Sequence, residues 1–401
     1  MQVPVRLLLA VKPSVAPALL VAIATSTMIF IATPFLLPAI AEDRGVSLAT
    51  VSWISATQLA GFVAASWLAG KFLKPIRSVF ITGATLGVAA NLASAVAPTL
   101  VLLAAARSIS GVSLGLAAWF AWQAAFGDSG KTGDVAVVGP LVGTITAPAV
   151  SALIESVGVD WLFVVLAGVA GTPLLFAHKI SRSDILRPHR TRHQATRAAR
   201  LILVALMLIT MGGSAVFVFA AAIGTGLNGV SVVTVSLLFS ANAIVGIPAA
   251  KWTGPRGPAG VWFIGTAICA MLIASVRNDV VYAAGLVAWG FVFFMGIPAA
   301  FGLLASRSAF PEERAGDAQA VMALGRVFGP LIGGALIAHG SSGTLGLVSA
   351  GIIGSAATML LYADRRYVAA IIRRCQSPRA RFRRLTSVSS FKEGSHQAEP
   401  E

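Results

Sequence analysis

Residues 178–200 read HKISRSDILRPHRTRHQATRAAR and form a polar stretch near the middle of the chain. The stretch holds seven Lys/Arg residues and one acid, and a long, very apolar half lies on each side of it. A bilayer core about 30 Å thick cannot accommodate 23 mostly polar residues, so this segment is an aqueous loop.

The two apolar halves resemble each other. GVSLATVS at 45–52 returns as GVSVVTVS at 229–236, and KFLKP at 71–75 returns as KWTGP at 251–255. VVGPLVG at 137–143 returns as VFGPLIG at 327–333. Three matches in the same order at offsets of 184, 180 and 190 residues indicate a duplicated unit. The sequence therefore predicts two related membrane bundles joined by a basic linker, an arrangement typical of transporters.

Composition places the chain in lipid. Of 401 residues 57% are hydrophobic and 11% charged, and the mean hydropathy is +0.84. The net charge of +15 does not indicate nucleic acid, because the basic residues follow membrane topology. Of the 30 Lys/Arg residues, 26 fall in the termini or in alternate loops. Arg44 and Arg277 fall in the opposite loops, and Arg107 and Arg326 fall within helices. This positive-inside bias predicts that both termini lie in the cytoplasm.

Apolar runs predict an all-α membrane protein with twelve transmembrane helices. The expected helices cover about 18–40, 50–68, 79–96, 100–124, 135–157, 161–176, 201–223, 230–250, 259–276, 280–304, 318–338 and 344–363. Pro34 is expected to break the first helix. The expected domains are a cytoplasmic N-terminus at 1–16, six-helix bundles at 17–177 and 201–363, the linker at 178–200, and a basic cytoplasmic tail at 364–401. The tail either forms a short helix on an anionic inner leaflet or is a disordered topology determinant.

The residues that carry chemistry are sparse. Two cysteines and five histidines, none of the histidines at mid-membrane depth, predict no disulfide framework, no metal site and no catalytic residue. AFGDSGKT at 125–132 lacks the first glycine of a phosphate-binding loop and no strand precedes it, so we expect no nucleotide and no cofactor. No Asp or Glu is expected near mid-depth, which makes proton coupling through a buried carboxylate doubtful. The chain is not expected to be an enzyme.

Four motifs resemble those of the major facilitator superfamily, over residues of about 20–365. They are GKFLKPIR at 70–77 between helices 2 and 3, RSISG at 107–111 in helix 4, GPLVG at 139–143 in helix 5, and WLF at 161–163 opening helix 6. The usual Asp of the first motif is absent, and Lys74 stands nearest to its place. The second copy of the Gly-Pro motif, at 329–334, points to helix bending as much as to transport.

The resemblance implies a twelve-helix transporter fold in which helices 1, 4, 7 and 10 line a central cavity. On those helices the candidate substrate-cavity residues are Thr25, Ser26, Thr27, Arg107, Trp119, Trp122, Gln123, Met211, Ser214, Trp289 and Phe293. The candidate conformational residues are Gly70, Lys74, Arg77, Gly111, Gly139, Pro140, Gly143, Arg326, Gly329 and Pro330. Aromatic and Met side chains suit an amphipathic ligand, but core packing explains most of them equally well.

Arg107 and Arg326 are the most informative single residues. An arginine near mid-membrane costs at least about 2.5–3.5 kcal/mol on insertion scales, so it faces a cavity or a partner. Either one or both meet an anionic substrate, or they bond to backbone carbonyls freed by nearby glycines. Gly111, one turn from Arg107, is expected to leave room beside it.

A latch of opposite charges is expected at the cytoplasmic side. Its basic groups, in the loop after helix 2, are Lys71, Lys74 and Arg77. Its acidic groups, in the loop leading into helix 11, are Glu312, Glu313 and Asp317. Ordinary solvated loop charges are the alternative. The overall interpretation of the sequence is a monomeric alternating-access transporter of the cell inner membrane that exports small amphipathic or drug-like molecules. The alternatives are an organic-anion carrier using Arg107 and a non-transporting substrate sensor. The expected partners are a small molecule and a bilayer with an anionic inner leaflet, without nucleic acid.

Overall fold

A computed structural model describes residues 15–125, 129–180, 193–252, 254–339 and 341–364, without the side chains of residues 71, 125, 129–133, 136, 312–313 and 315. Most of the expected N-terminal segment, the middle of the linker and the basic tail lie outside these ranges.

Every described element is helical. The elements are α1 (Pro17–Asp43), α2 (Leu48–Phe72), α3 (Arg77–Ala95), α4 (Leu100–Ala125), α5 (Ser129–Leu175), η2 (Ala177–Lys179), α6 (Arg197–Phe217), α7 (Ala220–Gly226), α8 (Val232–Ala250), α9 (Ala259–Ser275), α10 (Asp279–Ser306), α11 (Pro311–His339) and a last helix, Ser342–Asp364. The all-α prediction is therefore confirmed over the described residues.

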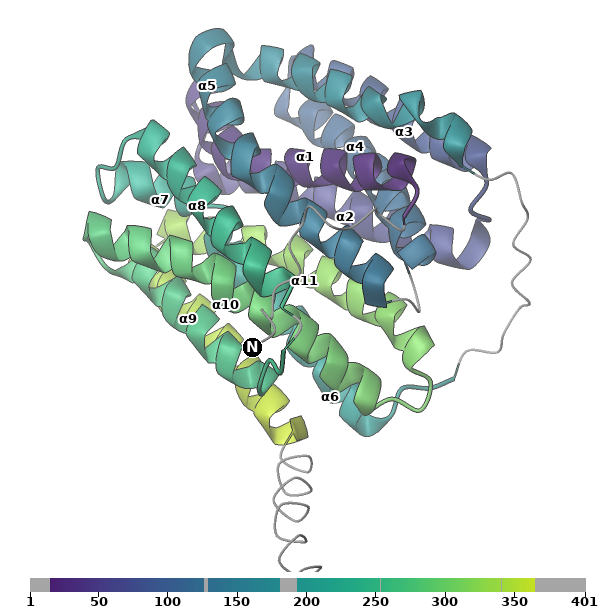
Figure 1. Ribbon diagram of the computed structural model, residues 1–401. Coiled ribbons are helices and arrows are strands. Elements are labelled where there is room, and N and C mark those ends of the chain that lie inside the picture. The colour runs from purple at the N-terminus through teal and green to yellow at the C-terminus, as the bar shows by residue number, and fades with distance from the viewer. Residues whose placement is uncertain (1–14, 126–128, 181–192, 253, 340, 365–401) are drawn as a thin grey trace, which may run out of the picture.

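The helices are consistent with twelve membrane crossings. Ten described segments are long and apolar enough to span a bilayer, and α9 is a shorter apolar helix. One of the ten, Val137–Lys179, has 43 residues and would be about 64 Å long as one straight helix. It breaks at Gly158, whose φ of 83° and ψ of 178° are not helical. In Figure 1 the ribbon labelled α5 turns back on itself, so the element makes two crossings.

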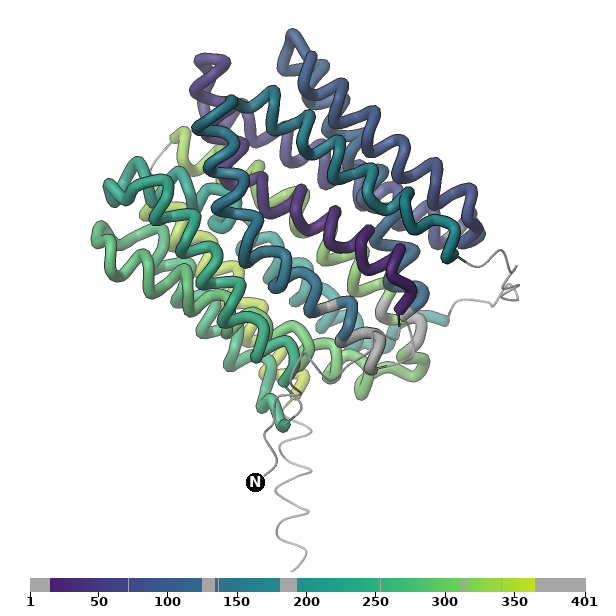
Figure 2. The backbone as a smooth tube through the Cα atoms, turned by 45° about the horizontal axis from the view of Figure 1, so that its top comes forward, coloured from purple at the N-terminus to yellow at the C-terminus, as the bar shows by residue number. Residues whose placement is uncertain are grey.

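The helices form two bundles that lie side by side (Figures 1 and 2). α1–α5 form the N-terminal bundle, and α6 to the last helix form the C-terminal bundle. The bundles meet mainly through three helix pairs: α2 with α11, α5 with α8, and α1 with α7. We call the end of the molecule next to Lys179 and Arg197 the linker end, and the opposite end, at the α1–α2 turn, the Gly45 end.

The duplicated sequence forms duplicated local structure. Gly45 and Gly229 have φ values of 61° and 64°, which a residue with a side chain rarely adopts. Two residues later, Ser47 and Ser231 cap α2 and α8 by accepting hydrogen bonds from the backbone N–H groups of Thr50 (3.2 Å) and Thr234 (3.1 Å). The repeat therefore encodes the same turn and cap in both bundles.

Several expected helix boundaries differ from the structure, and the continuous helix expected over 201–223 is two helices, α6 and α7, separated at 218–219. α1 runs without a break through Pro34, so the expected break is wrong; in a packed membrane bundle the neighbouring helices tolerate one missing hydrogen bond. α6 begins at Arg197, because Thr196 caps it and its first charged turn can remain exposed. α11 begins at Pro311, a residue favoured in the first helical turn.

The outer surface matches a membrane environment. Large apolar side chains such as Val101 (78% exposed), Ile145 (66%) and Leu347 (61%) face outward from both bundles. Trp53 and Trp161 lie exposed near the Gly45 end, and Tyr362 near the linker end, as expected for aromatic residues at the two membrane surfaces.

Candidate functional site

Aromatic side chains join the two bundles toward the Gly45 end. Phe35 of α1 contacts Phe239 of α8 across the bundle interface, with ring centroids 5.1 Å apart. Phe239 contacts Phe217 of α6 at 5.1 Å, and Phe217 lies 5.9 Å from Trp289 of α10. We call these four residues the aromatic plug. Phe35 belongs to the N-terminal bundle and the other three rings to the C-terminal bundle, so the plug packs across the bundle interface toward the Gly45 side.

A glycine contact closes the neighbouring α2–α11 interface. A Cβ atom at Gly334 of α11 would lie 2.6 Å from Oγ and 2.9 Å from Cβ of Ser52 on α2. The two helices can approach this closely only because position 334 has no side chain. The Gly45 end of the interface is therefore packed shut in this conformation.

The Gly-Pro motifs lie at equivalent helix contacts in the two bundles. Gly139 faces Thr27 of α1, where an added Cβ would lie 3.9 Å from Cγ2. Gly329 faces Ser214 of α6 so closely that an added Cβ would overlap its hydroxyl. Pro140 and Pro330 lie inside α5 and α11 without ending them. These residues therefore pack helices within each bundle, and the Thr27 and Ser214 side chains occupy that contact.

Gly143 lies where the bundles meet. An added Cβ would be 3.0 Å from Cδ1 of Ile31 on α1 and 3.1 Å from Cβ of Ala243 on α8. Among the predicted conformational residues, it is the one whose surroundings come from both bundles.

Arg107 is fully buried inside the N-terminal bundle. Its Nη1 donates a 2.7 Å hydrogen bond to Oδ1 of Asn91 on α3, and its guanidinium lies 5.2 Å from the ring centre of Phe163 on α5. The Asn91 amide N–H donates to the Gly87 carbonyl oxygen at 2.7 Å, which leaves its oxygen free to accept from Arg107. Nε and Nη2 of Arg107 have no hydrogen-bond partner among the described groups.

The expected space beside Arg107 does not exist. A Cβ at Gly111 would overlap the Gln58 carbonyl oxygen of α2, so this glycine lets α2 and α4 touch. The expectation that Gly111 leaves room for a ligand is wrong. The reason is that a small residue in a membrane helix usually permits backbone contact rather than an open site.

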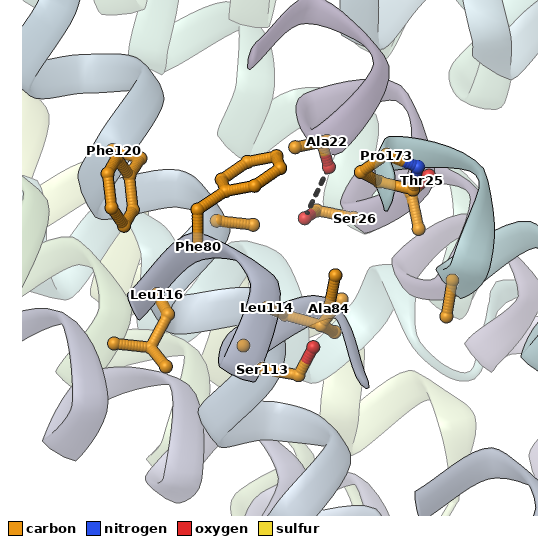
Figure 3. A pocket seen from close by; sticks show the side chains of 13 residues that line it. Ala22, Thr25, Ser26, Phe80, Ala84, Ser113, Leu114, Leu116, Phe120 and Pro173 are labelled. Atoms are coloured by element: carbon orange, nitrogen blue, oxygen red, sulfur yellow. Dashed lines mark hydrogen bonds between the residues drawn. The ribbon is translucent and has the colours of Figure 1, made fainter. Parts of the chain in front are cut away.

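Thr25 and Ser26 line a small cavity within the N-terminal bundle (Figure 3). The cavity of about 20 Å³ lies between α1, α3, α4 and the second crossing of α5, and has room for about one water. Thr25 Oγ1 donates to the Val169 carbonyl oxygen at 3.2 Å, and Ser26 Oγ donates to that of Ala22 at 2.8 Å. This cavity is too small for a substrate.

The other predicted cavity residues are distributed along the bundle interiors. Trp119 lies against Gly70, 3.6 Å from a Cβ added there, and Trp122 packs on the same apolar cluster. Oε1 of Gln123 is buried without a described hydrogen-bond partner. On α10, Phe293 contacts Phe294 with ring centroids 5.7 Å apart. Met211 of α6 and Arg326 of α11 lie at one depth, because a Cβ at Gly325 would be 3.0 Å from the Met211 nitrogen.

At the linker end, an ion pair joins the two bundles: Nζ of Lys251, the residue that caps the end of α8, lies 3.3 Å from Oδ1 of Asp134 on α5. For the expected latch, Lys74 is exposed, Nε of Arg77 has no described partner, and Asp317 binds Arg314 at 2.8 Å. The side chains of Lys71, Glu312 and Glu313 lie outside the described set. The latch stays a prediction.

Two features were missed by sequence reasoning. Asn91 is the acceptor for Arg107, and only carboxylates, water, substrate and backbone oxygen had been considered. The aromatic plug uses Phe35, Phe217 and Phe239, which are apolar residues in apolar helices. No local pattern distinguishes them from core residues; only their positions near the same end of α1, α6 and α8 could have suggested the contact.

Comparisons with known proteins agree with this architecture. A family model described as Major Facilitator Superfamily matches residues 18–326. A crystal structure of the nucleoside transporter NupG (D323A mutant) is similar at a TM-score of 0.64 and 12% identity, covering 86% of this chain and 99% of that chain. The human organic anion transporter MFSD10 (TETRAN) is similar at a TM-score of 0.61 and 15% identity, covering 86% and 97%. No curated protein matches the sequence significantly.

Proposed function

This chain belongs to the Major Facilitator Superfamily, and we propose that it is a secondary active transporter that exports small amphipathic or drug-like molecules by alternating access. The observation that carries the proposal is the packing of two pseudo-symmetric bundles against each other through close contacts at the Gly45 end. The aromatic plug and the Gly334–Ser52 contact close the Gly45 end. A carrier of this design exposes its site at one end at a time by rocking one bundle against the other.

The charge distribution supports an orientation with the linker end in the cytoplasm. At the linker end the described basic residues at helix ends and in loops are Lys74, Arg77, Lys179, Arg197, Arg200, Lys251, Arg256, Arg307 and Arg314. Arg44 and Arg277 are their counterparts at the Gly45 end. This asymmetry favours cytoplasmic termini in a cell inner membrane, with the closed end facing outward.

The groups near the interface suit an amphipathic molecule. Met211, Phe217 and Trp289 supply polarizable apolar surface from α6 and α10. Among the described side chains, each Asp or Glu lies within two turns of a helix end or of the Gly158 break. A buried carboxylate is therefore not available from these residues as a proton carrier, and a different coupling ion or an exchange mechanism fits better.

A growth screen tests the export proposal. Cells that overproduce the protein are exposed to a panel of toxic compounds, and the hits are then tested for movement into inside-out liposomes containing the purified protein. Export predicts resistance to at least one compound and its uptake into the liposomes. A folded protein that binds a hit but moves none of it would support the sensor alternative.

An organic-anion carrier is the second candidate. The observation that favours it is a cation in the membrane-embedded part of the chain. MFSD10, described as an organic anion transporter, has the same fold. A hit list restricted to carboxylates and sulfonates would favour this candidate over general drug export.

A further inference from the structure

Arg326 is a charged side chain halfway along a membrane helix. It lies 15 residues from Pro311 and 13 residues from His339, the two ends of α11. Its side chain is partly exposed, and it makes no hydrogen bond or ion pair with the residues whose side chains are described. A guanidinium cannot lose its charge in a protein, so this group needs an acceptor that the described chain does not supply.

The geometry of α11 shows which way Arg326 faces. Leu324 (38% exposed) and Phe328 (46% exposed) lie two residues before and after it and face outward. Two residues on an α-helix differ by about 200°, so Arg326 lies on the opposite side from the lipid-facing residues. On the remaining surface, Gly325 and Gly329 contact α6, while Gly334 contacts α2 of the other bundle. Arg326 therefore lies between the contact with its own bundle and the contact with the opposite bundle.

The depth of Arg326 determines the side from which it is reached. Gly329 and Gly333, one and two turns nearer the Gly45 end, contact Ser214 and Phe219 of α6. Phe217 of the aromatic plug lies between Ser214 and Phe219 in the sequence. The plug therefore lies on the Gly45 side of Arg326. Lipid lies on the opposite face of α11, and the plug lies toward the Gly45 end. The linker end is therefore the side from which a molecule can reach the Arg326 side chain.

Arg107 differs in each of these respects. It is fully buried, it has a side-chain acceptor in Asn91, and Phe163 covers its guanidinium. It lies inside one bundle rather than between two. Arg107 can therefore serve as the buried control when Arg326 is tested as a binding residue.

We propose that Arg326, rather than Arg107, receives the anionic end of an amphipathic substrate, most simply a carboxylate. Its planar fork can bind a carboxylate through two parallel hydrogen bonds, and Met211 at the same depth offers apolar surface for the rest of the molecule. The inference rests on the proposed transport function, which it narrows to organic anions.

Chemical modification tests the exposure of Arg326 without requiring transport. Purified protein in detergent is treated with phenylglyoxal, and modification of each arginine is followed by peptide mass spectrometry. Arg326 is expected to react at least about tenfold faster than Arg107, since the Arg326 side chain is partly exposed and Arg107 is fully buried. Equal or slower reaction at Arg326 would overturn the proposal.

The charge requirement is tested with 2-naphthoate and its neutral isostere 2-naphthamide. Millimolar 2-naphthoate is expected to slow modification of Arg326, and 2-naphthamide is expected to have little effect. Protection by both compounds alike, or by neither, would overturn carboxylate recognition at this residue.

Binding to variants completes the test. Calorimetric affinity for 2-naphthoate is expected to fall about tenfold or more in Arg326→Gln, and nearly as much in Arg326→Lys, because an ammonium lacks the fork. Unchanged affinity in folded Arg326→Gln contradicts the inference. If naphthoate binds and protects Arg326 but is not moved in liposomes, this inference stands and the transport proposal fails. If neutral compounds are transported but naphthoate does not protect Arg326, the transport proposal stands and this inference fails.

Discussion

Arg107 carries a permanent charge in the interior of one bundle, where its acceptor must be part of the fold. Asn91 provides that acceptor at 2.7 Å, and Phe163 covers the cation. Sequence reasoning located the charge but not its partner, because Asn91 is one polar residue in another helix and only folding brings the two together. The same reasoning placed Arg107 in the substrate cavity and Arg326 among the conformational residues. The different burial of the two side chains depends on helix rotation, which a uniformly apolar helix does not encode.

At this scale we predict that Arg107→Ala mainly lowers folded yield. Removing the side chain leaves the buried Asn91 oxygen unpaired and opens a cavity, at a cost of about 2–5 kcal/mol. Asn91→Leu should be at least as damaging, about 3–5 kcal/mol, because it leaves a buried charge without its acceptor. Asn91→Asp should fold, since a carboxylate also accepts from Arg107. Yield and melting temperature in detergent measure these effects.

Transport per folded molecule separates the structural role from a substrate role. We expect the folded fraction of Arg107→Ala to transport normally. Normal yield together with lost substrate binding would instead return Arg107 to the site.

Single helices show where composition predicts structure and where it does not. Long apolar runs located the membrane helices, because lipid requires each segment to satisfy its own backbone. The charged first turns of α6 and α11 were assigned to loops, since the capping residue Thr196 and the leading Pro311 were given less weight than charge. The Pro34 break was wrong for a related reason: tertiary packing overrides a local helix breaker.

Arg256, in the loop between α8 and α9, ties two helices together. Nη1 donates to the carbonyl oxygens of Ala249 (2.6 Å) and Phe294 (3.2 Å), and Nη2 donates to those of Ala250 (3.1 Å) and Trp252 (2.8 Å). Partial burial lowers the pKa of this guanidinium below its usual value, although it remains charged at neutral pH. The Phe294 oxygen needs this donor because Pro298, four residues on in α10, has no N–H to offer it.

We predict that Arg256→Ala destabilises the protein by about 2–4 kcal/mol, since several carbonyl groups lose their donor. Pro298→Ala should partly rescue it, because the new N–H can bond to the Phe294 oxygen. Melting temperatures of the two single variants and the double variant form the measurement. Arg277→Ala, in the next loop on the opposite side, is the control and should stay within about 0.5 kcal/mol. Strictly additive effects would contradict the shared role of Arg256 and Pro298.

The Lys251–Asp134 ion pair connects α8 and α5 across the bundles at the linker end. We predict that Lys251→Glu increases labelling of a Val138→Cys probe, one turn along α5, by at least about 5-fold. The two side chains of the ion pair are only 16% and 11% exposed, so breaking the pair costs at least about 1 kcal/mol. The probe is read with a membrane-impermeant maleimide in protein lacking Cys269 and Cys375. The swapped pair Lys251→Asp with Asp134→Lys should restore slow labelling. Fast labelling in the swapped pair would show that the attraction is not the cause.

The distribution of basic residues over the whole molecule predicts its orientation in the membrane. The basic residues gather at the linker end, so a reporter near Arg190 or after Glu401 should behave as cytoplasmic, and one near Ser342 as external. Paired alkaline phosphatase and fluorescent protein fusions measure this. A cytoplasmic signal at Ser342 would reverse the assignment of the closed end.

Closure of the Gly45 end depends on the missing side chain at Gly334, and this gives the last prediction. A Cβ there would press on Ser52 at 2.6 and 2.9 Å and lie 3.2 Å from Cα of Ala49, both on the opposite bundle. Gly334→Ala therefore penalises the closed conformation by about 1–3 kcal/mol while sparing one in which the bundles separate. Because about 1.4 kcal/mol changes a population ratio tenfold, the open state should gain about 5- to 150-fold in relative population. External labelling of a Ser55→Cys probe, a buried position about one turn along α2 from Ser52, should rise, and transport should slow at normal folded yield. Ser52→Gly should partly reverse the effect, and Gly351→Ala, where an added Cβ meets no atom within 4 Å, should have none. If Gly334→Ala lowered the folded yield without changing labelling, the contact would be part of the static fold rather than a gate that opens.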